Sequence, residues 1–261
     1  MRRDDATVRL DANQSAVADR GVKGMIPIPT AHGGDSRPFL DYVLSALADA
    51  GITDVVLVLG PEHDAVRSYY QQDGVLSRLR VRFAQQAEPL GTANAVLAAA
   101  DVIGGASFLV LNADNYYPPA ALRWLVEHDG DATIAFDRDT LVRDGNIDAD
   151  RVRAFAVLQV TADGRLTSII EKPGDRIDLA SDDARWVGMN CWSISPAIVD
   201  ACRRVPRSVR GEFELPEAVA LAIADGTVVR AERMALPVLD LSQRADIAAV
   251  AQRLSTLTPR P

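Results

Sequence analysis

The chain is poor in cysteine, histidine and lysine, and each shortage excludes a class of site. Its two cysteines, Cys191 and Cys202, cannot build a disulfide framework, and no CxxC pair is present for zinc. The three histidines, at positions 32, 63 and 128, share no metal-ligand spacing and belong to no Ser/His/Asp or Cys/His pattern. We therefore expect neither structural zinc nor nucleophilic catalysis by a serine or a cysteine.

Long apolar segments are also missing. The longest apolar runs, at 55–59 and 218–224, are far too short to span a bilayer. No apolar stretch follows Met1-Arg2-Arg3, so the pattern of a secretory signal peptide is absent. These features lead us to expect a cytoplasmic protein without a membrane partner.

Positive charge is scarce, and lysine is the scarcer of its two sources. The 261 residues include 28 lysines and arginines against 36 aspartates and glutamates, which gives a formal net charge of −8. Such an acidic chain is a poor partner for nucleic acid, so we expect no nucleic-acid ligand. Only Lys23 and Lys172 are lysines. A GC-rich coding bias accounts for much of the arginine excess, and the alternative is that these two lysines serve a ligand.

The first 150 residues alternate between β-branched runs and stretches with apolar residues at helical spacing. Strands are expected at 55–59, 81–84, 108–111 and 132–136, and helices at 38–50, 62–72, 92–100 and 120–127. This alternation with short connections predicts an α/β fold with three α/β/α layers and a mostly parallel central sheet.

The pattern becomes more antiparallel after about residue 150. Strands are expected at 152–160, 166–170, 186–194 and 228–234, and helices at 196–202, 216–224 and 243–254. A turn at 161–164 joins the first two strands as a hairpin. We expect one domain over 1–261, with a nucleotide-sized half to about residue 150 and a second half from 151.

Three polar segments lie where predicted strands end, which is where ligands bind in open parallel sheets. Asp114 follows the strand at 108–111, although an Asx turn would explain it equally well. The segment 86–93 opens a helix at Gly91-Thr92, where free backbone N–H groups can meet a ligand, or where Thr92 simply caps the helix. Lys172 in Glu171-Lys172-Pro173 offers a compact charge to a phosphate, or is a solvated surface residue.

Nine short motifs occur in an order that resembles the sugar-1-phosphate nucleotidyltransferases over nearly the whole chain. They are Lys23-x-x-x-Pro27-Ile28, Arg37-Pro38-Phe39-Leu40-Asp41-Tyr42-Val43, Gly51-Ile52-x-Asp54, Gln86-x-x-Pro89-x-Gly91-Thr92-Ala93, Asn112-x-Asp114-Asn115, Glu171-Lys172-Pro173, Val187-Gly188-Met189, Gly211-Glu212-Phe213-Glu214-Leu215 and Asp240-Leu241. Each motif is weak alone, and the order makes the resemblance specific. It implies the nucleotide-diphospho-sugar transferase fold.

The resemblance also implies a reaction, in which a nucleoside triphosphate and a sugar or cyclitol 1-phosphate give a nucleotide sugar and pyrophosphate. It assigns roles to eleven residues. Lys23 contacts the triphosphate, Gln86, Gly91 and Thr92 bind the nucleotide, Asp114 and Asp240 hold Mg²⁺, Lys172 holds the sugar phosphate, and Asn115, Glu171, Gly188 and Glu212 contact the substrate. Which base and which sugar are used is left open, and a homo-oligomer is possible.

Elementary chemistry agrees with these implied roles. The attacking phosphate oxygen is already ionised at neutral pH, so no general base is required. Two negative charges about 4 Å apart repel by several kcal/mol at an effective dielectric near 20. A divalent ion and two lysines would offset this repulsion, and hard oxygen ligands favour Mg²⁺.

The sequence departs from the family pattern at its start. The family begins with a glycine-rich loop, broadly L-A-A-G-x-G-T-R, which these residues do not contain. Three explanations are open: the natural start lies upstream of Met1, the protein is a non-catalytic relative, or another segment replaces the loop. We expect the first, because a parallel sheet without its central strand would leave two neighbouring strands with open edges.

Two smaller departures from the family pattern concern single positions or pairs of positions. Arg37 stands where the family has lysine, and Ser242-Gln243 stands where Gly-Thr is usual, beside Asp240.

The runner-up function is a nucleotide-sugar-binding or regulatory relative without catalysis. A glycosyltransferase of related fold would carry Asp-x-Asp, and Asn112-Ala113-Asp114 argues against it.

Overall fold

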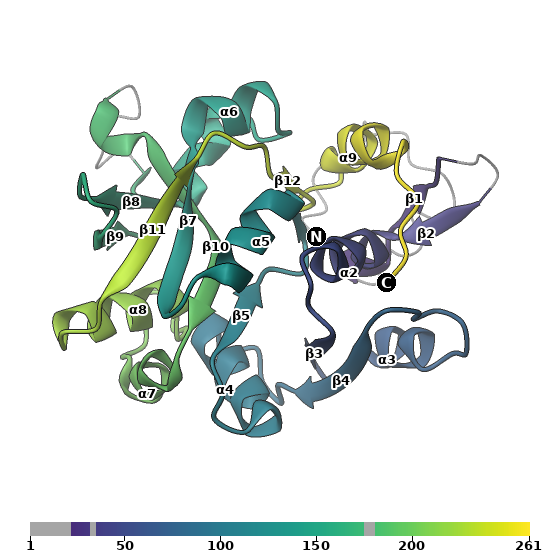
Figure 1. The fold of residues 1–261 in the computed structure, drawn as a ribbon, viewed down its shortest axis with the longest axis horizontal. Coiled ribbons are helices and arrows are strands. Elements are labelled where there is room, and N and C mark those ends of the chain that lie inside the picture. Colours follow the sequence, from purple (N-terminus) through teal and green to yellow (C-terminus); the bar gives the residue numbers. More distant parts are fainter. Residues whose placement is uncertain (1–21, 32–34, 175–180) are drawn as a thin grey trace.

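The computed structural model describes residues 22–31, 35–174 and 181–261, and the α/β class expected from the sequence is confirmed (Figure 1). Its largest sheet has six strands, in the order β11-β7-β10-β8-β9 with β5 also pairing with β10. These strands are β5 (Phe108–Leu111), β7 (Asp131–Asp137), β8 (Ala156–Val160), β9 (Leu166–Ile170), β10 (Trp186–Ile194) and β11 (Val229–Met234).

The large sheet is mixed, because β10 crosses its centre in the opposite direction to its neighbours. β10 is antiparallel to β5, β7 and β8, and β8 is antiparallel to β9. Among the described residues, parallel pairing is confined to β11 with β7 in this sheet and to β3 (Asp54–Leu59) with β4 (Arg80–Gln85). The described strands therefore contain less parallel pairing than the alternation of strands and helices predicted.

Two further strand pairs bring distant segments together. β1 (Pro27–Pro29) and β2 (Ser36–Pro38) form an antiparallel pair close to the start of the described chain. β6 (Asn115–Tyr116) pairs with β12 (Leu239–Asp240), so that Asp240 lies opposite Asn115. The second pair places two of the predicted site residues side by side.

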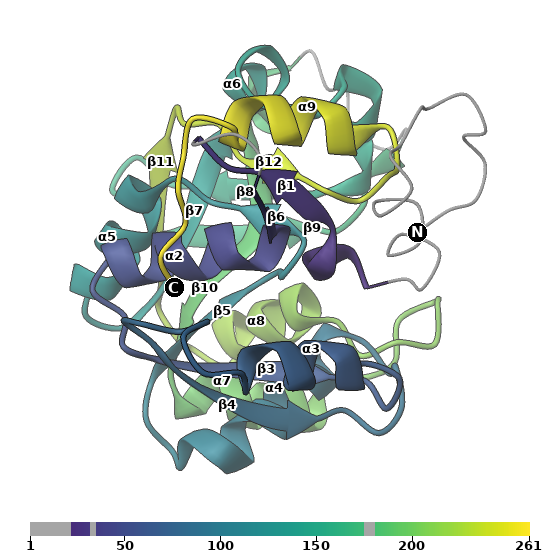
Figure 2. The same ribbon diagram turned by 90° about the vertical axis from the view of Figure 1, so that its right-hand side faces the viewer.

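Helices cover the strands from two sides. They are α2 (Phe39–Asp49), α3 (Asp64–Tyr70), α4 (Thr92–Ile103), α5 (Pro119–Glu127), α6 (Arg138–Arg143), α7 (Pro196–Arg204), α8 (Leu215–Ala224) and α9 (Asp246–Leu254). Figure 2 shows α2 and α9 on one side of β5 and α4 and α7 on the other. The described ranges also contain short 3₁₀ segments at η1 (Lys23–Met25), η2 (Ala149–Ala154) and η4 (Asp182–Ala184).

Two hydrophobic clusters form the core, and each draws residues from both sides of position 150. The larger one joins Phe39 of α2 with Ile247 of α9, and the smaller one joins Val96 of α4 with Trp192 of β10. Apolar faces of helices and sheet are thus buried together, and this burial is the main stabilising term. Within the described ranges, no helix is both long and apolar enough to cross a bilayer.

The strand predicted at 152–160 begins later than expected. Residues Ala149–Ala154 form the 3₁₀ segment η2, and β8 starts at Ala156. Val152 of η2 is buried, and the Arg151 side chain turns toward two buried carboxylates. Helix α6 was not predicted, although Asp137 caps it by accepting a hydrogen bond from the Thr140 N–H at 2.9 Å.

Candidate active site

The site begins where the chain leaves β5. Asp114 lies between β5 and β6, and the Nζ of Lys23 in η1 donates a hydrogen bond to its Oδ2 at 2.8 Å. The two side chains are 26% and 27% exposed, and they line a large cavity together with Asn112 and Asn190. Two residues predicted to act on the triphosphate are therefore in direct contact although 91 positions separate them.

Asp240 reaches the same place through the β6–β12 pair. The Leu241 N–H donates to the Asp114 carbonyl at 2.8 Å, which fixes β12 beside the end of β5. Asp240 is 1% exposed, and this burial is the main reason why the pKa of its carboxyl is raised. A hydrogen bond from Ser242 opposes the rise in pKa, and the negative charge of Asp114 adds to it.

The Asp240 carboxylate is held by four hydrogen bonds. Oδ2 accepts from Asn115 Nδ2 at 3.0 Å and from Ser242 Oγ at 2.9 Å. Oδ1 accepts from the Ser242 N–H at 3.1 Å and from the guanidinium of Arg151, which also bonds to buried Asp246. Asn115 is 1% exposed, so its amide supports Asp240 here, and direct contact of Asn115 with substrate stays a prediction.

These bonds bear on the magnesium ion that the family resemblance implies. Asp114 fits as one carboxylate ligand, because it is partly exposed beside the cavity and Lys23 is its one ion-pair partner among the described residues. Mg²⁺ commonly takes one or two carboxylates and completes its shell with water and phosphate. The described ranges hold no cluster of three or more His, Cys, Asp or Glu suited to a metal. The Asp240 carboxylate would have to give up one of its four hydrogen bonds before it could serve as a second ligand of Mg²⁺.

The predicted nucleotide-binding residues surround the start of α4. The Gln86 amide nitrogen donates to the Gly91 carbonyl at 3.0 Å and to Asn94 Oδ1 at 2.9 Å. Thr92 Oγ1 accepts from the Leu215 N–H at 2.8 Å, rather than capping its own helix. The loop is thus fastened on one side by Gln86 and on the other by the segment 211–215.

Glycine is required at position 91 for two reasons. Its φ is +103°, a conformation that residues with a Cβ rarely adopt. A Cβ there would also lie 2.5 Å from the carbonyl oxygen of Phe213 and 2.9 Å from its nitrogen. The close approach of the two backbones therefore explains Gly91 structurally, beside its predicted contact with the nucleotide.

The predicted sugar-phosphate residues follow β9. Lys172 Nζ lies 3.6 Å from Glu171 Oε1, and the two side chains are 40% and 24% exposed. Burial raises the pKa of the Glu171 carboxyl, Lys172 opposes this rise, and the charge of Glu214 adds to it. Lys172 has a φ of +43°, so its ammonium is presented from a left-handed backbone conformation.

Gly188 and Glu212 complete the predicted set. Gly188 is buried in β10, and a Cβ there would lie 3.1 Å from Leu158 Cδ2, so the packing leaves little room for a side chain. Glu212 is 43% exposed and lies 3.8 Å from Arg210 Nη2. Arg210 also pairs with buried Glu214, which connects this segment to the surroundings of Glu171.

Sequence reasoning missed three residues that shape the site. Asn190 has a φ of +51° within an irregular stretch of β10 and lines the cavity, and asparagine is a residue that tolerates this conformation. Asn146 donates to the Asp240 carbonyl at 2.8 Å and accepts from the Asp240 N–H at 2.8 Å. Arg151 pairs with two distant aspartates, for which the local sequence carries no signal.

Comparison with known proteins finds similarity over most of the chain. The family described as nucleotidyl transferase matches residues 26–231. A UTP–glucose-1-phosphate uridylyltransferase of Haloferax volcanii is 29% identical over 238 residues, covering 90% of this chain and 89% of that protein. A glucose-1-phosphate thymidylyltransferase of Streptomyces antibioticus is 31% identical over 203 residues, covering 75% of this chain and 51% of that protein.

Solved structures agree on the fold. A crystal structure of UDP-glucose pyrophosphorylase complexed with UDP-glucose superposes with a TM-score of 0.72 at 14% identity, covering 88% of this chain and 89% of the other. The UTP-bound enzyme from Acinetobacter baumannii gives 0.70 at 17% identity, covering 91% and 89%. Several curated relatives are longer: the chain spans 54% of a Haloferax volcanii nucleotidyltransferase of low-salt glycan biosynthesis, which is 27% identical over 217 residues and 82% of this chain.

The close approach at Gly91 can be separated from its positive φ by comparing two glycines of the same helix. Gly104 ends α4 with a φ of +82°, and a Cβ added there would meet nothing within 4 Å beyond its chain neighbours. We expect Gly104→Ala to cost about 1 kcal/mol of unfolding free energy. Gly91→Ala should cost roughly 1–3 kcal/mol more through overpacking against Phe213. Urea denaturation measures both, and equal losses would contradict the predicted clash.

The buried ion cluster gives a second stability prediction. Arg151→Met leaves Asp240 and Asp246 buried without their shared cation, so we expect a loss of about 3 kcal/mol or more in unfolding free energy. Arg203→Met is the control, because Arg203 and Asp200 are 54% and 68% exposed and such pairs contribute about 1 kcal/mol or less. If the two variants unfold at the same urea concentration, the cluster does not stabilise the fold as described.

Proposed function

The chain belongs to the nucleotidyl transferase family, and we propose that it joins a nucleoside triphosphate to a sugar 1-phosphate, forming a nucleotide sugar and pyrophosphate. The observation that carries this proposal is the contact of Lys23 with Asp114 at the end of β5, beside the buried Asp240. The only other lysine, Lys172, lies next to Glu171 at the end of β9. One lysine that contacts the aspartate after β5 and a second that follows β9 suit a reaction between two phosphates in an otherwise acidic protein.

The names of the relatives support a narrower choice of substrates. The similar curated proteins are a uridylyltransferase and thymidylyltransferases that act on glucose 1-phosphate. We therefore propose UTP or dTTP and glucose 1-phosphate as the first substrates to test. Uracil and thymine present the same hydrogen-bonding edge, and the Gln86 amide oxygen could accept from its ring N–H while the amide nitrogen donates to Gly91 and Asn94.

The proposed reaction needs no general base. An ionised oxygen of the sugar phosphate attacks the α-phosphorus of the triphosphate and forms a new P–O bond. The bond from the α-phosphorus to the bridging oxygen breaks, and pyrophosphate leaves with that electron pair. Because the attacking oxygen carries no proton at neutral pH, the described residues have only to position the reactants and to offset their charge.

Each lysine has one substrate in this scheme. Lys23 would bind the triphosphate and Lys172 the sugar phosphate, each as a compact charge that follows a phosphate of changing geometry. Magnesium, when bound by Asp114 with Asp240 as the second carboxylate, would supply further positive charge to the triphosphate and its leaving group. Glu171, Gly188 and Glu212 would then contact the sugar.

The role of Asp114 is tested by pyrophosphate release from UTP or dTTP and glucose 1-phosphate. We expect release to require both substrates and Mg²⁺, and Asp114→Asn to lower kcat by roughly 100-fold or more. Asp49→Asn removes a carboxylate that is 48% exposed and paired with Arg78, and it should leave kcat unchanged. Undiminished turnover of Asp114→Asn would refute its role. Saturable binding of UDP-glucose without any pyrophosphate release would instead support the alternative function, a nucleotide-sugar-binding or regulatory protein without catalysis.

Substitution of each lysine should weaken the binding of one substrate and leave the binding of the other nearly unchanged. Loss of a charged hydrogen bond costs about 1.5–3 kcal/mol, which is about tenfold or more in binding. We expect Lys172→Met to raise the KM for glucose 1-phosphate by at least that factor and to leave the KM for the triphosphate within about twofold. Lys23→Met should show the opposite pattern. Steady-state kinetics with one substrate varied at a time distinguishes this from a general structural defect, which would change both constants.

A further inference from the structure

β10 is irregular where it runs past the end of β5. The pairing of these two strands ends with Leu111 opposite Cys191, and the next position on β10, Asn190, has a φ of +51°. The pairing of β10 with β7 also shifts its register between Gly188 and Trp192. Backbone groups in such a bulge lose partners on the neighbouring strand, so other donors and acceptors have to satisfy them.

Two buried hydroxyls supply partners in this irregular stretch. The Tyr117 hydroxyl donates to the Met189 carbonyl at 2.6 Å and also reaches the Asn190 carbonyl at 3.4 Å. On the β7 side, the Thr133 hydroxyl donates to the Cys191 carbonyl at 2.8 Å. Tyr117 is 1% exposed and Thr133 is fully buried, so bulk water does not readily replace either hydroxyl.

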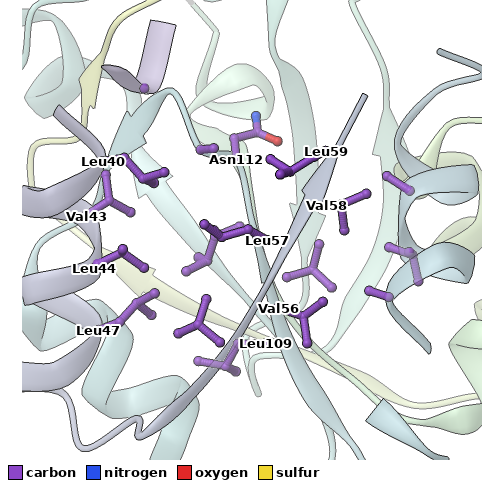
Figure 3. A pocket seen from close by; sticks show the side chains of 18 of the residues that line it. Leu40, Val43, Leu44, Leu47, Val56, Leu57, Val58, Leu59, Leu109 and Asn112 are labelled. Carbon is purple, nitrogen blue, oxygen red and sulfur yellow. The ribbon is translucent and has the colours of Figure 1, made fainter. Parts of the chain in front are cut away.

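The Tyr117 hydroxyl also closes the loop that carries Asp114. The Asn112 N–H donates to the same phenol oxygen at 3.3 Å, so this hydroxyl joins the two ends of the segment 112–117. Asp114 lies within this segment, and Figure 3 shows the Asn112 side chain at one end of the cavity. One oxygen atom thus connects the end of β5, the loop that follows it and β10.

Packing in the core holds the phenol ring in place. Its centroid lies 6.5 Å from that of Phe136 in β7, and both residues belong to the larger core cluster. Burial is the main reason why the pKa of the Tyr117 hydroxyl is raised, and the negative charge of Asp114 adds to the rise. The hydroxyl therefore keeps its proton at neutral pH and remains a donor to β10.

The phenol meets β10 beside residues that face the site. Gly188, which the family resemblance assigns to the substrate, precedes Met189, and Asn190 follows Met189 and lines the cavity. The segment around Asp114 is therefore fastened to the part of β10 that is expected to contact the sugar.

We propose that Tyr117 is a positioning residue, whose hydroxyl sets the spacing between Asp114 and the part of β10 around Gly188. This inference rests on the proposed function, in which Asp114 acts on the triphosphate side and Gly188 contacts the sugar. The two reactants must meet in line, and a misplacement of about 1 Å can cost about 100-fold in rate. Loss of an interaction that serves only this alignment lowers kcat and leaves KM nearly unchanged.

Tyr117→Phe removes the hydroxyl and keeps the ring. We expect kcat for pyrophosphate release to fall by about tenfold or more, and the KM values of both substrates to stay within about twofold. Tyr42→Phe is the matched control, because Tyr42 is also 1% exposed and its hydroxyl also donates to a backbone carbonyl, that of Pro29, at 2.9 Å. This control should leave kcat within about twofold. Each variant loses one buried hydrogen-bonding group, so urea denaturation should show similar losses of stability.

Amide hydrogen exchange gives a readout that does not depend on activity. Exchange at the Asn112 N–H should become about tenfold faster or more in Tyr117→Phe, and it should stay unchanged in Tyr42→Phe. Unchanged exchange at Asn112 in Tyr117→Phe would overturn the proposal, as would an equal loss of kcat in both variants. If the unaltered protein releases no pyrophosphate, the proposed reaction is refuted and this role with it, whereas an active protein whose Tyr117→Phe variant keeps its kcat refutes the role alone.

Discussion

One buried negative charge governs the arrangement of the site. Asp240 is almost fully enclosed, and a carboxylate in that position is tolerated when donors surround it. Its donors come from β6, from η2 and from the residues that follow it, which are far apart in the sequence. Satisfying this one group therefore ties the end of β5 to the last strand and fixes where Asp114 stands relative to Lys23.

The same arrangement places a cationic side chain at the site although the protein as a whole is acidic. Its net charge of −8 disfavours anions at long range, but screening limits that effect to about 8–10 Å in physiological salt. Within that range the local charges decide. Arg151 offsets one of the two negative charges of buried Asp240 and Asp246, and the half-buried ammonium of Lys23 lines the cavity in contact with Asp114. Arginine thus serves the fold here and lysine the surface of the site.

Sequence patterns predicted the parts of the fold that depend on local signals. The bounds of β5, β9 and β10 match the predicted ranges, because each is a mostly apolar segment whose ends are marked in the local sequence. The position of Asp114 at a strand end followed from the same reading. Arg151 could not be found this way, since its partner Asp240 is 89 positions away and its own segment alternates like a strand.

Backbone conformation at two positions was also not predictable from the sequence. Asn190 interrupts β10 with a positive φ, and neither the neighbouring residues nor the pattern of apolar residues in this segment predicts the irregularity. Gly91 was expected to serve a ligand, yet its contact with Phe213 already requires glycine. A glycine beside a site therefore has two possible causes, and only three-dimensional contacts distinguish them.

Lys172 has a cost that comes with its position. Holding a residue with a side chain at a φ of +43° typically costs of the order of 1–3 kcal/mol, and glycine would adopt this conformation without that cost. Glycine, however, would remove the Lys172 ammonium from beside Glu171. At position 172, glycine would therefore favour stability, whereas lysine places the charge. Efforts to make the protein more heat-resistant by relaxing its backbone would do better to begin elsewhere.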